Sequence, residues 1–142
     1  MKKALVMTIA AALTLGLAAP GTAAIRITKI YFDSPGADTG SNTSLNAEYV
    51  VIKNTGTTRK ALTGWTLRDA SHHVYKFPTF RLGAGKSVKV HTGKGANTLG
   101  NLYWRSSSYI WNNDGDTATL KRSNGTVASR CSYTGAGSYK IC

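Results

Sequence analysis

Residues 45–95 read LNAEYVVIKNTGTTRKALTGWTLRDASHHVYKFPTFRLGAGKSVKVHTGKG, and this stretch decides the fold. Short runs of alternating side chains stand between turn signals, namely EYVVIKN, GWTLRD, HVYKFP and KSVKVHTG. Successive side chains of a strand point to opposite faces of its sheet. Trp65 therefore shares a face with Leu67, and Val88 shares one with Val90, while the polar residues between them take the other face. Such half-apolar strands are typical of antiparallel sheets with one face in water.

The chain on either side continues this pattern. The first run, IRITKIYFD at residues 25–33, is rich in β-branched and aromatic side chains and predicts a strand. Residues 34–44 predict a loop by composition, and LYWR and SYIW supply two more short strands. TATLKR and TVASRCSY flank the tight-turn signal Asn124-Gly125 and predict a hairpin. With no amphipathic helix in the pattern, the sequence predicts an all-β, antiparallel β-sandwich of seven to nine short strands.

The central hairpin supplies the candidates for the core of this sandwich. GWTLRD and HVYKF stand on either side of a short turn at residues 69–72. Large apolar side chains on these two strands are the ones that a two-layer fold would bury. We therefore expect the core to contain Trp65, Leu67, Val74, Tyr75 and Phe77.

The first residues have the layout of a secretory signal peptide. Lys2 and Lys3 precede an apolar run at residues 4–19, and small residues follow it. We expect cleavage after Ala23 or Ala24, which leaves one domain at residues 25–142 and predicts a secreted or cell-surface protein. A retained membrane anchor is the alternative, although the run is short for a spanning helix. No later run is long enough to span a membrane.

The chain is strongly basic, with 18 Lys and Arg against 6 Asp and Glu and a net charge of +12. A cationic domain is attracted to polyanions such as nucleic acid or an acidic wall polymer. A charged surface that only keeps a secreted protein soluble is the alternative. The candidate anion-binding residues, all interleaved with the predicted strands or at their ends, are Lys53, Arg68, Lys76, Lys86, Lys89, Lys94 and Arg105.

Aromatic side chains cluster in sequence near some of these cations, at Tyr103, Trp104, Tyr109 and Trp111. Exposed aromatics beside basic groups would suit single-stranded nucleic acid or glycan stacking. The alternative is that Trp104 and Trp111 belong to the core.

The two cysteines, Cys131 and Cys142, both lie near the C-terminus. In an oxidising compartment a pair of cysteines predicts a disulfide, which would fix a terminus that otherwise frays. The spacing matches neither a zinc site nor a catalytic thiol.

These pieces together resemble the lamin tail domain, and in particular its stand-alone members in secreted bacterial proteins. The resemblance extends over about residues 25–125 and implies an immunoglobulin-like β-sandwich. It also implies a module that contacts proteins or DNA, and it implies no catalytic residue. Its matching motifs are EYVVIKN at 48–54, LTGWTLRD at 62–69, YKFP at 75–78, LGAG at 82–85, VKV at 88–90, WNNDGD at 111–116 and ATL at 118–120.

Three other groups of residues invite a chemical interpretation. The turn from Asn112 to Asp116 is rich in oxygen ligands that could bind calcium, but we expect a structural turn because no ligand glutamate follows it. His72, His73 and His91 could be bases or ligands, but form no evident catalytic trio, so we expect surface or turn residues.

Glu48 shares its parity with apolar neighbours and should be partly covered. A buried carboxylate of this kind could be an acid of raised pKa. More often it accepts hydrogen bonds from a neighbouring loop, which is what we expect here.

These observations favour a secreted, non-catalytic module without a cofactor or metal, which binds an anionic partner by charge. A protein-interaction module such as an adhesin or inhibitor is the alternative, and it would use an exposed sheet edge or an apolar patch. A small hydrolase or nuclease is the third hypothesis, and it would depend on the histidines.

Overall fold

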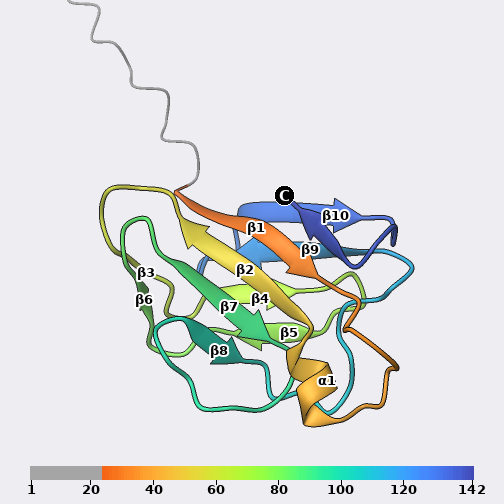
Figure 1. Cartoon of the computed structure of the whole chain (residues 1–142). Coiled ribbons are helices and arrows are strands. Elements are labelled where there is room, and N and C mark those ends of the chain that lie inside the picture. Colours follow the sequence, from red (N-terminus) through yellow and green to blue (C-terminus); the bar gives the residue numbers. More distant parts are fainter. Residues whose placement is uncertain (1–23) are drawn as a thin grey trace, which may run out of the picture.

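The structure is a computed structural model and describes residues 24–142. The predicted signal peptide at residues 1–24 lies outside the described residues except for Ala24. The elements in chain order (Figure 1) are β1 (Ile25–Tyr31), α1 (Asn42–Asn46), β2 (Tyr49–Asn54), β3 (Lys60–Ala61), β4 (Thr66–Arg68), β5 (Val74–Lys76), β6 (Arg81–Leu82), β7 (Ser87–His91), β8 (Asn101–Tyr103), β9 (Asp116–Lys121), β10 (Val127–Tyr133) and β11 (Tyr139–Ile141).

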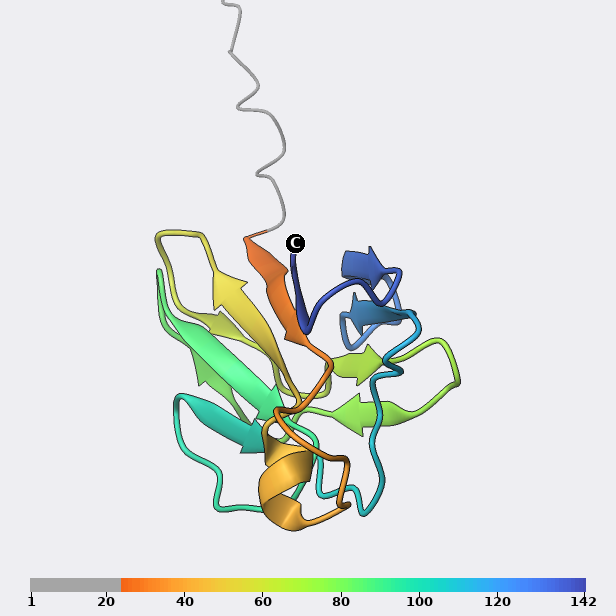
Figure 2. The same ribbon diagram turned by 45° about the vertical axis from the view of Figure 1, so that its right-hand side comes forward.

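Two sheets pack face to face, which confirms the predicted β-sandwich (Figures 1 and 2). One sheet has the strand order β11-β1-β2-β7-β8 and the other has the order β10-β9-β4-β5, while β3 and β6 form a small separate pair. All pairs are antiparallel except β7 with β8, which run parallel. The all-antiparallel prediction is wrong at this edge because residues 92–100 carry the chain back to the start of β7 before β8 begins.

The core lies between the two sheets, and the alternation of side chains along each strand predicted most of its residues. Leu67, Val88 and Val90 have at most 1% of their surface exposed, while Trp65 packs against the core and is only partly buried. Val74 was predicted to be a core residue, and this is wrong, because it is 46% exposed. Its neighbour Tyr75 stands opposite Leu67 in the pairing of β5 with β4 and takes the inward face. Val74 must therefore point outward.

Two segments differ from their predicted secondary structure. The predicted loop at residues 34–44 overlaps the short helix α1, which begins after the N-cap Ser41 and buries Leu45. The run SYIW at 108–111 is not a strand, because the backbone N–H groups of Ile110 and Trp111 donate to the Glu48 carboxylate instead of to a neighbouring strand. The strands β3, β6 and β11 were not predicted, since two- and three-residue runs carry little periodicity.

Glu48 is completely buried and connects three segments of the chain. Its Oε1 accepts hydrogen bonds from Thr92 Oγ1 (2.6 Å), from Ile110 N (2.8 Å) and from Trp111 N (3.1 Å). Its Oε2 has no hydrogen-bond partner among the described residues. Burial raises the pKa of this carboxyl to about 7, against the smaller lowering effects of those hydrogen bonds.

Cys131 on β10 and Cys142 after β11 form the predicted disulfide. The bond joins an edge strand of one sheet to the terminus that follows an edge strand of the other. It therefore links the two layers of the sandwich at one side. In the described part of the chain, the single helix is too short and too polar to cross a membrane.

We predict that Glu48→Gln flattens the pH dependence of stability. A folded-state pKa above the ordinary value means that the fold binds the proton more tightly than the unfolded chain does. Stability is then full below pH 4.5 and falls as the pH rises to about 7, by up to about 3 kcal/mol. Urea unfolding at pH 4.5, 6 and 7.5 measures this fall in the wild type and its loss in the variant.

The exposed carboxyl of Asp114 offers a matched control, because Asp114→Asn removes one titrating group without touching the core. It should leave the wild-type slope unchanged. A Glu48→Gln protein that keeps the full slope would show that another group is responsible.

We predict that removing the disulfide by Cys131→Ser with Cys142→Ser lowers the free energy of unfolding by about 2–3 kcal/mol, because the bond closes a loop with a sequence separation of 11. Thermal unfolding with and without reductant tests this. The wild type should drop to the stability of the variant when reduced, and the variant should be insensitive to reductant. Equal stability of the two oxidised proteins would contradict the prediction.

Candidate functional site

A row of aromatic side chains crosses the outer face of the five-stranded sheet. Register places Tyr31 opposite Tyr139 on one side and Tyr49 on the other. Tyr49 stands opposite His91, and His91 stands opposite Tyr103. Each of the five strands thus contributes one aromatic ring to the same row, which we call the tyrosine ladder. Its members are Tyr139, Tyr31, Tyr49, His91 and Tyr103.

Neighbouring rings of the tyrosine ladder are in contact. The centroid separations along the row are 6.0 Å, 5.5 Å, 5.7 Å and 5.0 Å. These are the distances of an aromatic pair, and adjacent strands set them by their own spacing. A planar ligand cannot enter between two rings without parting them. The ladder therefore offers a ligand the outer edges of the rings, and it offers ring faces only at its ends.

Cations fill the next rows of this face. Lys29 Nζ lies 4.5 Å from the ring centroid of Tyr139 and 5.5 Å from that of Tyr31. Lys89 Nζ lies 4.6 Å from the centroid of Tyr49, so both ammonium groups are held against the ladder. Further along the strands, Arg26 stands opposite Lys53.

No acidic residue accompanies these cations on the face. Among the described strands, the outward-pointing residues of the five-stranded sheet include no Asp or Glu. Of the acidic residues nearest this sheet, Glu48 is buried beneath it and Asp33 follows the end of β1. The strand residues of this face therefore combine aromatic edges with positive charge and contribute no carboxylate side chain.

His91 is fixed within the ladder by two hydrogen bonds. Its Nδ1 lies 2.7 Å from the backbone oxygen of Asn46, and its Nε2 lies 2.8 Å from Asn101 Oδ1. This arrangement holds the ring nearly parallel to Tyr103, at an interplanar angle of 17°. His91 was predicted to be a surface or turn residue, and it lies half-buried at the surface, on the outer face of the sheet at the end of β7.

The three histidines do not come together. His72 and His73 lie exposed at the turn between β4 and β5, in the other sheet from His91. His73 Nδ1 lies 2.7 Å from Oδ2 of Asp69, and Asp69 is buried. Among the described residues, no group of three His, Cys, Asp or Glu side chains is arranged to hold a metal ion.

The seven predicted anion-binding residues divide between several places. Lys53 and Lys89 lie on the ladder face. Arg68 and Lys76 point outward from the four-stranded sheet, on the opposite side of the sandwich. Lys86 lies in the turn before β7, whereas Lys94 and Arg105 lie in the segments that follow the ladder ends of β7 and β8.

The aromatic residues between 103 and 111 also divide. Trp111 is buried and packs edge-on against Trp104, which is partly buried, so the core interpretation is the right one for both. The hydroxyl of Tyr109 bonds to Gly40 N and Ser44 Oγ and fastens a loop. Of the predicted exposed aromatics, Tyr103 alone joins the ladder.

Sequence reasoning missed the other tyrosines of the ladder. Parity puts Tyr49 outward, opposite to Val50 and Ile52, but parity does not say which residues of two strands stand side by side. Register supplies that information, and it depends on tertiary pairing. The available signal was an outward aromatic at the same end of successive strands.

The oxygen-rich turn near Asp116 is a structural turn. Asp116 Oδ1 accepts from Ala70 N (2.9 Å) and Thr117 N (2.8 Å), and Oδ2 accepts from Asn112 N (3.2 Å). The carboxylate is buried and is used to join this turn to the β4–β5 connection.

Comparison with known proteins gave one result. A family model described as Lamin Tail Domain matches residues 18–135. A search of curated proteins found no match to the chain.

We predict that adjacent rings of the ladder stabilise one another. A double-mutant cycle with Tyr31→Ala and Tyr49→Ala should give a coupling free energy of about 0.5–1 kcal/mol in chemical unfolding. The matched cycle is Tyr139→Ala with Tyr103→Ala at the two ends of the row, and it should give a coupling near zero. Equal coupling in both cycles would mean that the rings do not act through direct contact.

Proposed function

The chain belongs to the lamin tail domain family, and on that premise we propose that it is a secreted, non-catalytic module that binds an anionic polymer on the ladder face. The family consists of immunoglobulin-like domains that bind rather than catalyse. The observation that carries the proposal is the juxtaposition of the tyrosine ladder with Lys29 and Lys89. Secretion is inferred from residues 1–24, whose pattern is that of a signal peptide.

The shape of the face favours an extended ligand. Five strands side by side span more than a single charged group needs, and the ladder runs across all of them. A polymer with repeating negative charges can lie along this row, with its anionic groups on Lys29, Lys89 and Lys53. Phosphate groups paired with lysines supply most of the sequence-independent affinity of such complexes.

The closed ladder also limits how the polymer is held. Because neighbouring rings touch, the bases or sugars of a ligand would contact ring edges and could stack only at an end of the row. Tyr139 is at one such end and is 52% exposed. Binding should therefore depend more on charge than on stacking, and little on base sequence.

We predict that Lys29→Gln with Lys89→Gln weakens binding of a single-stranded oligonucleotide by about tenfold at low ionic strength. The slope of log K against log salt should become shallower by about 1.4, because two phosphate contacts are lost. Fluorescence anisotropy over a salt series measures both quantities. Poly(glycerol phosphate) as a competitor shows whether the polymer backbone alone is enough.

A matched control lies on the opposite sheet. Lys76→Gln with Lys121→Gln removes the same charge from a row that crosses β5, β4 and β9. If the face is the site, this variant keeps most of the affinity. Equal weakening by both variants, or no salt-sensitive binding of either polymer to the wild type, would overturn the proposal.

A further inference from the structure

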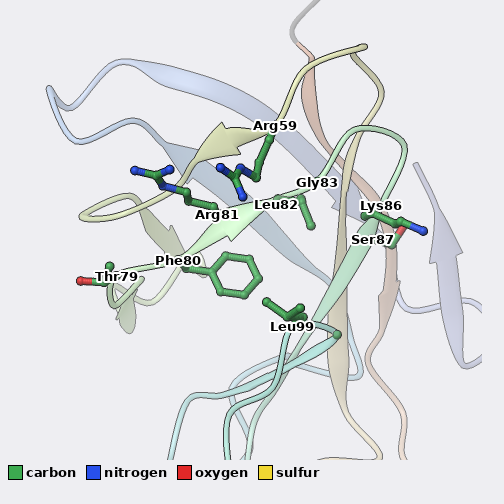
Figure 3. A pocket seen from close by; sticks show the side chains of 10 residues that line it. Arg59, Thr79, Phe80, Arg81, Leu82, Gly83, Lys86, Ser87 and Leu99 are labelled. Atoms are coloured by element: carbon green, nitrogen blue, oxygen red, sulfur yellow. The ribbon is translucent and has the colours of Figure 1, made fainter.

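A second cationic site lies at the opposite end of β7 and β8 from the tyrosine ladder. A pocket of about 540 Å³ opens beside the turn between β6 and β7 and beside the start of β8 (Figure 3). The residues that line it come from these segments, from β6 and from the residue before β3, and they include Arg59, Phe80, Arg81, Leu82, Lys86 and Leu99. Its volume is within the range of pockets that hold small molecules.

The floor and one wall of this pocket are apolar. Phe80 and Leu82 are buried residues of the core whose edges form the floor. Leu99 is 81% exposed, and in Figure 3 it stands across from the Phe80 ring, so that the two side chains point toward one another. A second hollow of about 450 Å³ shares Phe80 and Leu99 and continues toward Leu102.

The rim of the pocket is positively charged. Arg59 directly precedes β3, Arg81 lies on its partner strand β6, and Lys86 lies in the turn that follows β6. Neither Asp nor Glu lines the pocket. Within residues 24–142, none of these three cations forms an ion pair. In Figure 3 the Arg59 side chain reaches down toward the Phe80 ring, whereas the ends of the Arg81 and Lys86 side chains point away from it on either side.

An apolar floor and a cationic rim together favour an amphipathic ligand that carries a negative charge. We propose that the pocket binds a medium-chain fatty acid, of about eight to twelve carbons, with its alkyl chain between Phe80 and Leu99 and its carboxylate on Arg59. The planar guanidinium group matches a carboxylate with two parallel hydrogen bonds. The alkyl chain covers the exposed Leu99. This site is separate from the ladder and does not rest on the proposed function.

The experiment is an isothermal titration of the protein with octanoate, decanoate and dodecanoate, each below its micellar concentration. Affinity should rise by up to about fourfold for each added CH₂, because each methylene removes apolar surface from water. Decanol has the same chain without the charge and should bind about fivefold more weakly than decanoate. Equal affinity of decanol and decanoate, or no rise along the series, would overturn the proposal.

Variants of the pocket residues test whether decanoate binds in this pocket. Arg59→Gln with Arg81→Gln should weaken decanoate by about tenfold while leaving decanol unchanged, and Leu99→Gln should weaken both. These side chains are exposed, so the variants should fold. The matched control is Lys76→Gln with Lys121→Gln on the opposite sheet, which should change nothing. Equal weakening by the control would mean general charge attraction and would reject the pocket.

The ladder variant separates this result from the proposed function. Lys29→Gln with Lys89→Gln should bind decanoate as tightly as the wild type does. If that variant loses the polymer but keeps decanoate, the two sites are independent. Loss of decanoate in that variant would move the fatty acid to the ladder face and would overturn the inference.

Discussion

The arrangement of the strand ends depends on one buried carboxylate. Glu48 precedes Tyr49 on β2, and its partner Thr92 follows His91 on β7. The same oxygen holds the backbone of Ile110 and Trp111, which would otherwise be buried without partners. This acceptor thus adds a side-chain contact to the backbone pairing of β2 with β7 at the end where the aromatic rings stand. It also holds the segment of Ile110 and Trp111 against that end of the sheet.

In the larger sheet, alternate residues of each strand point into the core, and the residues between them point to the outer face, where a ligand could bind. On β2, Val50 and Ile52 are completely buried, whereas Tyr49, Val51 and Lys53 face outward. The outward residues contribute little to the core, so selection for a ligand can change them without unfolding the sandwich. The same division explains the four-stranded sheet, where Leu67 and Tyr75 are inside and Arg68 and Lys76 are outside. A fold of this kind accepts a binding face on either side, and the aromatic row distinguishes the two.

Sequence reasoning succeeded for properties of a single strand, such as which of its residues point inward. It failed for properties that depend on how strands pair with one another. Alternation within one strand predicted that Leu67, Val88 and Val90 are inside, and the presence of two cysteines near the C-terminus predicted the disulfide. Alternation alone did not decide between Val74 and Tyr75, because both are apolar and adjacent. The pairing with β4 decides which of the two points inward. The ladder is the clearest case, since Tyr31, Tyr49 and Tyr139 are far apart in sequence and become a row only when register aligns them. The pocket was likewise hidden, because Arg59, Arg81 and Leu99 come from three separate segments.

The end of the ladder depends on the C-terminal disulfide. β11 has three residues and pairs only with β1, so hydrogen bonds hold it from one side. Three exposed residues on a sheet edge are too few to order a terminus on their own. Cys142 ties the segment to Cys131 in the other sheet, and this constraint keeps Tyr139 beside Tyr31 and beneath the ammonium group of Lys29. The covalent bond between the two sheets is therefore also what completes the row across the fifth strand.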